Sequence, residues 1–97
     1  MSKRENVRNL EKAIAELLIR NDANDFRWIT EGERSADDNF STCLMIDGGA
    51  LVYFWEGDGW DEMNLVSEHH GHFAEPINYT DIGFYSIAEW DKVPTRS

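Results

Sequence analysis

Apolar side chains recur at helical spacing near the start of the chain, at Val7, Leu10, Ile14, Leu17 and Leu18. Steps of three and four residues put such side chains on one face of a helix. Ser2 and Glu5 fit a capping box, and the turn-forming residues 21–25 follow the stripe. The sequence therefore predicts an amphipathic helix from near Lys3 to near Arg20, with its apolar face covering a sheet.

Residues 40–67 contain three apolar runs separated by two glycine turns, Gly48-Gly49 and Gly57-Asp58-Gly59. Turns of these lengths and compositions connect antiparallel strands. We therefore expect a three-stranded antiparallel meander. Strand pairing across both turns directs one set of side chains toward the helix, namely Leu44, Ile46, Leu51, Tyr53, Met63 and Leu65. Val52 and Phe54 then lie on the opposite face, which needs a cover from the C-terminal third or from outside the chain.

Weaker patterns flank the meander. Residues 26–30 and 80–85 have the composition of short strands, whereas residues 73–76 are expected to be irregular. Ser86 and Glu89 repeat the capping-box spacing and predict a short helical turn from Ile87 to Lys92. The predicted fold is one α+β domain over residues 1–97. In it, the N-terminal helix packs on one face of a four- or five-stranded antiparallel sheet, and a short C-terminal helical turn follows.

Composition narrows the class of protein. The chain has 97 residues, and 41% of them are hydrophobic, which favours one globular domain with a modest core. No apolar run approaches the roughly 20 residues that cross a bilayer, and the N-terminus lacks the apolar core of a secretory signal. Cys43 is the one cysteine, so no intramolecular disulfide can form. We therefore expect a cytoplasmic protein with no membrane partner, and we expect Cys43 to be a small buried hydrophobe.

The net charge of −10 is unevenly distributed. No lysine or arginine occurs between Ser35 and Asp91, a span that contains twelve acidic residues. Such a field repels nucleic acid and attracts cationic partners, so we expect no direct nucleic-acid binding. The alternative is that the acids only keep an aromatic-rich protein soluble.

Tryptophans and carboxylates crowd the second glycine turn. They predict a protruding anionic knob that binds a basic protein surface, because tryptophan anchors many interfaces and acids pair with arginine or lysine. The alternative is a solvated hairpin whose indoles fold back onto the sheet. The candidate partner-binding residues are Trp55, Glu56, Asp58, Trp60, Asp61 and Glu62.

All three histidines lie close together, at His69, His70 and His72, with Glu68 and Glu75 nearby. Imidazoles at this spacing can reach one zinc ion, and a carboxylate can complete the site. The two alternatives are a solvated surface loop and a contact that responds to pH near 6. No catalytic signature is present: the glycine turns carry acids that would repel phosphate, and no nucleophile motif surrounds Cys43. The sequence thus predicts no enzyme, no catalytic residue and no cofactor other than this candidate zinc.

Two fragments, Trp28-Ile29 and residues 87–94, resemble the opening and closing signatures of small phage and prophage domains of unknown function. The resemblance covers about a tenth of the chain and carries no site residue. It adds only slightly to the case for a phage origin, and the main hypothesis follows from the charge pattern and the small size of the chain. The chain is a small acidic inhibitor that blocks a basic site on a nucleic-acid-processing partner, either as a phage anti-defence protein such as an anti-CRISPR or as an immunity protein against a toxin.

Two other hypotheses belong to different classes of protein. One is a metal-binding module or small metal-dependent enzyme that uses the loop containing His69, His70 and His72. The other is an assembly subunit that forms a homodimer or larger oligomer through an open sheet face.

Overall fold

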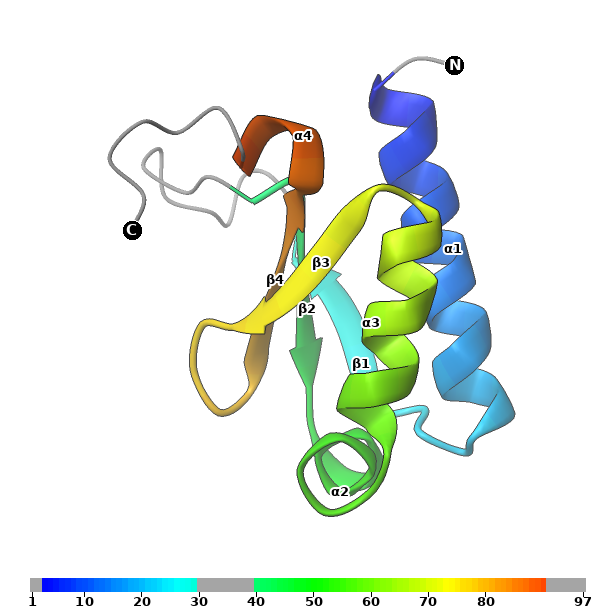
Figure 1. Ribbon diagram of the computed structural model, residues 1–97. Coiled ribbons are helices and arrows are strands. Elements are labelled where there is room, and N and C mark those ends of the chain that lie inside the picture. Colours follow the sequence, from blue (N-terminus) through cyan, green and yellow to red (C-terminus); the bar gives the residue numbers. More distant parts are fainter. Residues whose placement is uncertain (1–2, 30–39, 91–97) are drawn as a thin grey trace.

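The computed structural model describes residues 3–29 and 40–90 of the chain, and its elements form two layers (Figure 1). One layer is a four-stranded sheet with the order β1-β2-β4-β3, in which every neighbouring pair is antiparallel. Helices lie mainly on one side of this sheet (Figure 1). The predicted α+β class is therefore confirmed. The elements in chain order are α1 (Lys3–Arg20), β1 (Phe26–Ile29), β2 (Thr42–Ile46), α2 (Gly48–Glu56), α3 (Gly59–His69), β3 (His72–Pro76), β4 (Asp81–Ser86) and α4 (Ile87–Trp90).

The first helix has the predicted bounds, and its end shows why. Asp22 adopts a left-handed backbone conformation with φ of 58°. The amide of Ala23 then donates to the carbonyl of Leu18 at 2.8 Å, and that of Asp22 donates to Ile19 at 3.1 Å. This pair of bonds closes a helix in a Schellman motif. The side chain of Asn21 also donates to the carbonyl of Leu17 at 2.9 Å.

The core lies between α1 and the centre of the sheet. Leu44 of the central strand β2 pairs with Trp28 on one side and with Ile82 on the other. A hydrogen bond of 2.5 Å from the Thr42 hydroxyl to a carboxylate oxygen of Glu11 also ties β2 to α1. The buried apolar cluster comprises Leu10, Ile14, Leu17, Leu18, Ala23, Leu44, Ile46, Ala50, Phe54, Met63, Ala74, Ile82 and Phe84.

The expected meander over residues 40–67 is wrong beyond its first strand. Residues 48–56 and 59–69 form helices α2 and α3, so the two glycine segments begin helices and do not connect strands. Asp47 is the N-cap of α2, and its Oδ1 accepts a hydrogen bond from the Gly48 amide at 2.8 Å. Aspartate is favoured at such positions because its oxygen satisfies an end amide of the helix.

The buried positions in these helices follow a spacing of four residues. Ala50 and Phe54 are buried in α2, and Gly59, Met63 and Ser67 are buried in α3. Val52 and Leu65 are exposed, whereas Leu51 and Tyr53 are partly buried. The predicted inward set therefore holds for Leu44, Ile46 and Met63, but it fails for Leu65.

The third strand of the sheet comes from a region expected to be irregular. Residues 72–76 form the edge strand β3, which pairs with β4. Helix α3 packs beside this edge, and the Asn64 side chain accepts a hydrogen bond from the amide of Ala74 at 3.1 Å. The predicted strand at 80–85 is confirmed as β4, and that at 26–30 is confirmed over Phe26–Ile29. Residue Thr30, and Asp91 and Lys92 of the predicted C-terminal turn, lie outside the described residues.

Candidate partner-binding surface

The six candidate partner-binding residues lie where α2 meets α3, and we call this set the acidic corner. Trp55 and Glu56 end α2, Asp58 is the N-cap of α3, and Trp60, Asp61 and Glu62 occupy the first turn of α3. The corner is thus a junction of two helices and not the predicted hairpin tip. Glu56, Asp58 and Asp61 are exposed, Trp55 retains 38% of its accessible surface, and Trp60 and Glu62 are partly buried.

The two tryptophans of the corner touch each other and a third aromatic residue. The ring centroids of Trp55 and Trp60 lie 5.4 Å apart in an edge-to-face arrangement. Tyr79, in the turn between β3 and β4, stacks on Trp55 with centroids 5.4 Å apart and an interplanar angle of 13°. The indole N–H of Trp55 also donates to the carbonyl oxygen of Tyr79 at 2.9 Å. Sequence reasoning missed Tyr79, because 24 residues separate it from Trp55 and no local pattern links them.

The indoles of the corner differ in their surroundings. Trp60 packs inward against Phe54, with ring centroids 5.7 Å apart, and borders the core. Its indole N–H is buried and has no acceptor among the described residues. Leaving a buried donor unpaired costs about 1–3 kcal/mol. Trp55 is therefore the indole with exposed ring surface, whereas Trp60 packs between it and the core. Trp55 is exposed, as expected for the knob. Trp60 packs inward, as expected for the alternative in which the indoles fold back.

A hydrogen bond between Tyr53 and Glu62 connects α2 to α3. The Tyr53 hydroxyl donates to Glu62 Oε1 at 2.6 Å. Burial raises the pKa of the Tyr53 phenol well above its usual value, and the hydrogen bond and negative charge of Glu62 add to the rise. The positive charge of Arg20, at the end of α1, opposes the rise in this pKa. Tyr53 is therefore a neutral donor at physiological pH, and Glu62 serves this contact before it can serve a partner.

Replacing Tyr53 with phenylalanine is expected to lower the free energy of unfolding at pH 8 by about 1.5–3 kcal/mol, because a hydrogen bond to a charged acceptor is lost. The folded-state pKa exceeds the unfolded value of 10, so this stability is fully present below pH 10 and is lost progressively as the pH rises from 10 toward the folded pKa. Urea unfolding from pH 8 to pH 11 measures both effects. The Tyr53→Phe difference should shrink as the pH rises; a difference that stays constant would contradict this reading.

The acids of the corner have different electrostatic relations to their helices. A helix N-terminus carries a partial positive charge and stabilises nearby acids, and Asp61 and Glu62 lie in the first turn of α3. Glu56 is the last residue of α2, where the helix end is partially negative and no basic residue is present in the last turn. A lysine at position 56 would suit the helix better. The negative charge of Glu56 therefore does not serve the stability of α2.

The structure separates the roles of the three candidate metal ligands. His69 is exposed in the last turn of α3, His70 is the C-cap of that helix, and His72 is only 3% exposed in β3. The Nδ1 of His72 lies 2.8 Å from the carbonyl oxygen of His70, and its Nε2 lies 3.0 Å from the hydroxyl of Ser41. Within residues 3–29 and 40–90, no group of three or more histidine, cysteine or acidic side chains could hold a metal ion. The predicted three-histidine zinc site is therefore not assembled there.

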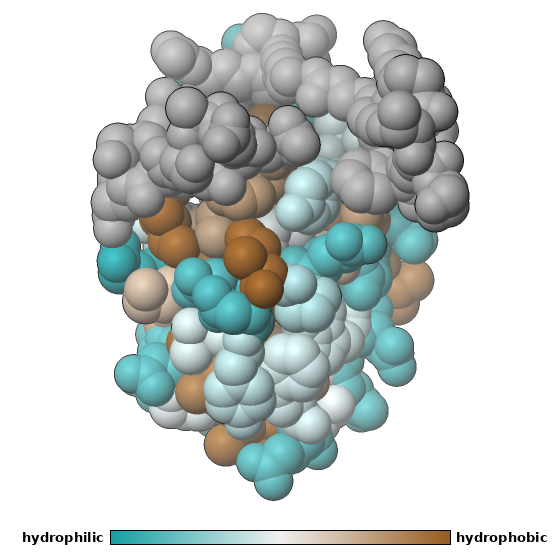
Figure 2. Space-filling view, turned by 90° about the vertical axis from the view of Figure 1, so that its left-hand side faces the viewer, coloured by the Kyte–Doolittle hydropathy of each residue, from teal (hydrophilic) through white to brown (hydrophobic). Residues whose placement is uncertain are grey.

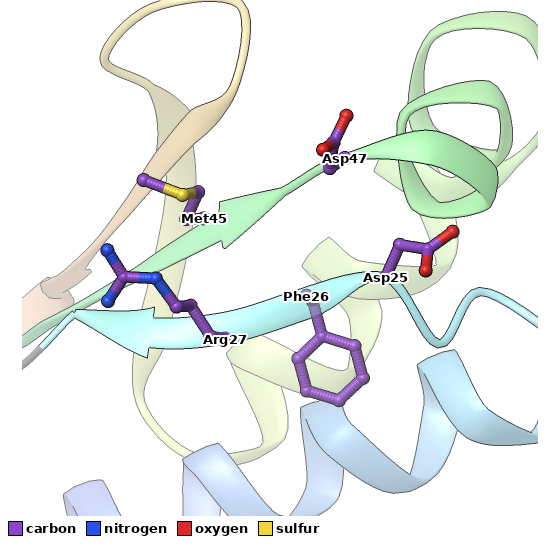
Figure 3. A pocket seen from close by; sticks show the side chains of 5 residues that line it. All are labelled: Asp25, Phe26, Arg27, Met45 and Asp47. Carbon is purple, nitrogen blue, oxygen red and sulfur yellow. The ribbon is translucent and has the colours of Figure 1, made fainter.

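A second group of acids lies at the start of α2, away from the corner. Asp25, Phe26, Arg27, Met45 and Asp47 line a shallow hollow of about 280 Å³ (Figure 3). The carboxylate of Asp25 accepts a hydrogen bond from the Gly49 amide at 3.0 Å, and Asp47 caps the helix. Figure 3 shows the ring of Phe26 directed toward α1, away from Arg27 and Met45. These acids satisfy end amides of α2, which is a structural role.

Comparison with known proteins yields no relative: no family model, no curated protein and no solved structure matches this chain. Among the described residues, no helix has the length and apolar character required to cross a bilayer. Cys43 is buried in β2, as expected.

Proposed function

We propose that this chain is a small, non-enzymatic binding protein that uses the acidic corner to occupy a basic site on a nucleic-acid-processing partner. The observation that carries the proposal is the setting of Glu56, Asp58 and Asp61. These three exposed acidic residues and the partly exposed Trp55 lie at the one junction of α2 and α3. Exposed aromatic side chains anchor many protein interfaces, and acids beside them can pair with arginine or lysine on a positively charged protein surface.

The position of Glu56 supports a binding role over simple solubility. An acid at the end of α2 opposes the helix dipole, so the stability of α2 does not explain the charge of Glu56. Residues that break a local rule of stability are often functional. The absence of lysine and arginine between residues 35 and 91 also leaves the corner without a basic residue from its own segment.

The biological setting follows from the partner. A cytoplasmic inhibitor that competes with nucleic acid fits both a phage anti-defence protein, such as an anti-CRISPR, and an immunity protein that neutralises a nuclease. The two settings differ only in the enzyme that is blocked. Neither the zinc module nor the oligomer through an open sheet face has a specific observation in its favour. Figure 2, viewed from the side opposite α1, shows apolar side chains set singly among hydrophilic ones where described residues are visible.

The immobilised chain is first used to capture a nucleic-acid-processing enzyme from a lysate of the host organism. The captured enzyme is then purified. We expect the enzyme to bind the chain and a nucleic-acid duplex competitively, with an affinity that falls steeply between 50 and 200 mM salt. Replacing Glu56 with lysine should weaken binding by about 2 kcal/mol, or roughly 30-fold, because an attraction of about 1 kcal/mol in water becomes a repulsion of similar size. Isothermal titration calorimetry measures both effects.

Glu68→Lys is the matched control, because Glu68 is also exposed near the C-terminal end of a helix but lies outside the corner. Both variants change the net charge equally and remove an acid from a helix C-terminus. Both should therefore match or exceed the native stability, by about 0.3–1 kcal/mol. If the two variants weaken binding equally, the chain binds by general charge attraction and not through the acidic corner, which contradicts the proposal. Binding that is insensitive to salt and to Glu56→Lys would refute it.

A further inference from the structure

We infer that the exposed face of Tyr79 is the docking point for an arginine side chain of the partner. This inference rests on the proposed function, because it assumes a basic partner, and it names the group that the partner contributes. Tyr79 lies in the turn between β3 and β4 and remains 63% exposed. An exposed aromatic ring beside acidic residues is a recognition element for a planar cation.

The ring of Tyr79 is held in place from one side. Its inner face stacks on Trp55, and the Trp55 indole N–H bonds to the Tyr79 carbonyl oxygen at 2.9 Å. The turn itself is fixed by Asn78, whose side-chain oxygen accepts from the amides of Thr80 and Asp81 at 2.9 Å each. The opposite ring face is therefore presented to solvent on a preorganised support. Preorganisation reduces the entropy that binding must otherwise cost.

The surroundings of the ring favour a cation. Glu56 follows Trp55 directly in the chain, and Asp81 closes the turn that holds Tyr79. Val52 lies one helical turn before Trp55 and is 54% exposed, so it adds exposed apolar surface beside Trp55. The turn lies on the side of the molecule that faces the viewer in Figure 2, where teal, hydrophilic side chains predominate among the visible described residues.

Arginine fits this site better than lysine. Its guanidinium is planar, stacks on aromatic faces, and retains N–H donors at its edge for a carboxylate. The ammonium of lysine is compact and strongly hydrated, so stacking gains it less. A partner arginine stacked on Tyr79 could thus use its edge to bond with an acid of the corner, which combines the two kinds of contact at one place.

The test uses two short blocked peptides as probes, one of alternating glycine and arginine and one of alternating glycine and lysine. Titration of the ¹⁵N-labelled chain, followed at the Trp55 indole N–H resonance, gives each affinity. We expect the arginine peptide to bind about 3-fold more tightly than the lysine peptide, which is the size of an exposed cation–π contact. Tyr79→Leu should abolish this preference, and Tyr79→Phe, which keeps the ring, should retain it.

The outcomes separate this inference from the proposed function. Equal affinity for the two peptides, or an arginine preference that survives Tyr79→Leu, overturns the docking point even if Glu56→Lys still weakens binding to the captured enzyme. An arginine preference that depends on Tyr79 supports the docking point even if no nucleic-acid-processing enzyme is inhibited. Tyr79→Leu leaves the backbone carbonyl that Trp55 bonds, so slow hydrogen exchange at the Trp55 indole N–H in the free variant, equal to that in the native chain, verifies that this hydrogen bond is intact.

Discussion

Replacing Phe54 with alanine should lower the free energy of unfolding by about 3–5 kcal/mol, the range for deleting a fully buried aromatic side chain. Phe54 is buried in α2, where its ring packs against those of Tyr53 and Trp60 at centroid distances of 5.3 and 5.7 Å. Its loss would leave a cavity directly beneath the acidic corner. Chemical denaturation monitored by far-UV circular dichroism measures the change.

Val52→Ala is the control for this prediction, and the pair tests the helical assignment of residues 48–56. Val52 is exposed on the helix, so its truncation should change the free energy of unfolding by no more than about 0.5 kcal/mol. In the strand expected from sequence, by contrast, Val52 and Phe54 would share one face and respond alike. Similar losses for the two variants would therefore contradict a helix at this position.

Gly59→Ala is the second change with a large expected effect. A Cβ atom at Gly59 would lie 2.6 Å from Cδ1 of Phe54 and 2.8 Å from the carbonyl oxygen of Tyr53. Such approaches force α2 and α3 apart, and overpacking of this kind costs about 1–3 kcal/mol. Because the acidic corner is the junction of these two helices, the variant should also weaken partner binding. Thermal unfolding and titration with the captured enzyme measure the two effects.

Gly49→Ala provides the matched control, because Gly49 also lies in the first turn of a helix. A Cβ there would have the carbonyl oxygen of Asp22 at 3.4 Å as its nearest neighbour, which is an ordinary contact. Alanine favours helix over glycine by up to about 1 kcal/mol, so this variant should be neutral or slightly stabilising. Equal destabilisation by both substitutions would show that glycine is needed for backbone freedom and not for the close approach of the helices.

The binding proposal depends on how the α2–α3 junction combines charge with aromatic surface. Asp58 and Asp61 lie at the start of α3, where its dipole stabilises them, while Glu56 has no such compensation. Tyr79 reaches the junction from the sheet and enlarges the aromatic surface that Trp55 offers. The proposed recognition surface thus combines the α2–α3 junction with the turn between β3 and β4, and its exposed acids come mainly from the junction.

The sequence misled most clearly over residues 48–69, and the reason is physical. The run from Leu51 to Trp55 is rich in β-branched and aromatic residues, which favour strands. The neighbouring segments that combine glycine with aspartate are typical of hairpin turns. Tertiary packing overrides such propensities. The contrary signals were the i, i+4 spacing of Ala50 and Phe54 and an aspartate directly before the first glycine of each helix. These aspartates, Asp47 and Asp58, stand where a helix N-cap is expected.

The sequence by itself determined α1, β1, β4, the α+β class and the uneven charge, because each depends on local periodicity or on composition. It also located the acidic corner along the chain. Only the tertiary structure decided that the corner joins two helices, that Tyr79 stacks on Trp55, and that His72 is buried against Ser41. These contacts join residues 24 and 31 positions apart, and their formation depends on the packing of α2 and α3 against the sheet. No local pattern encodes that packing.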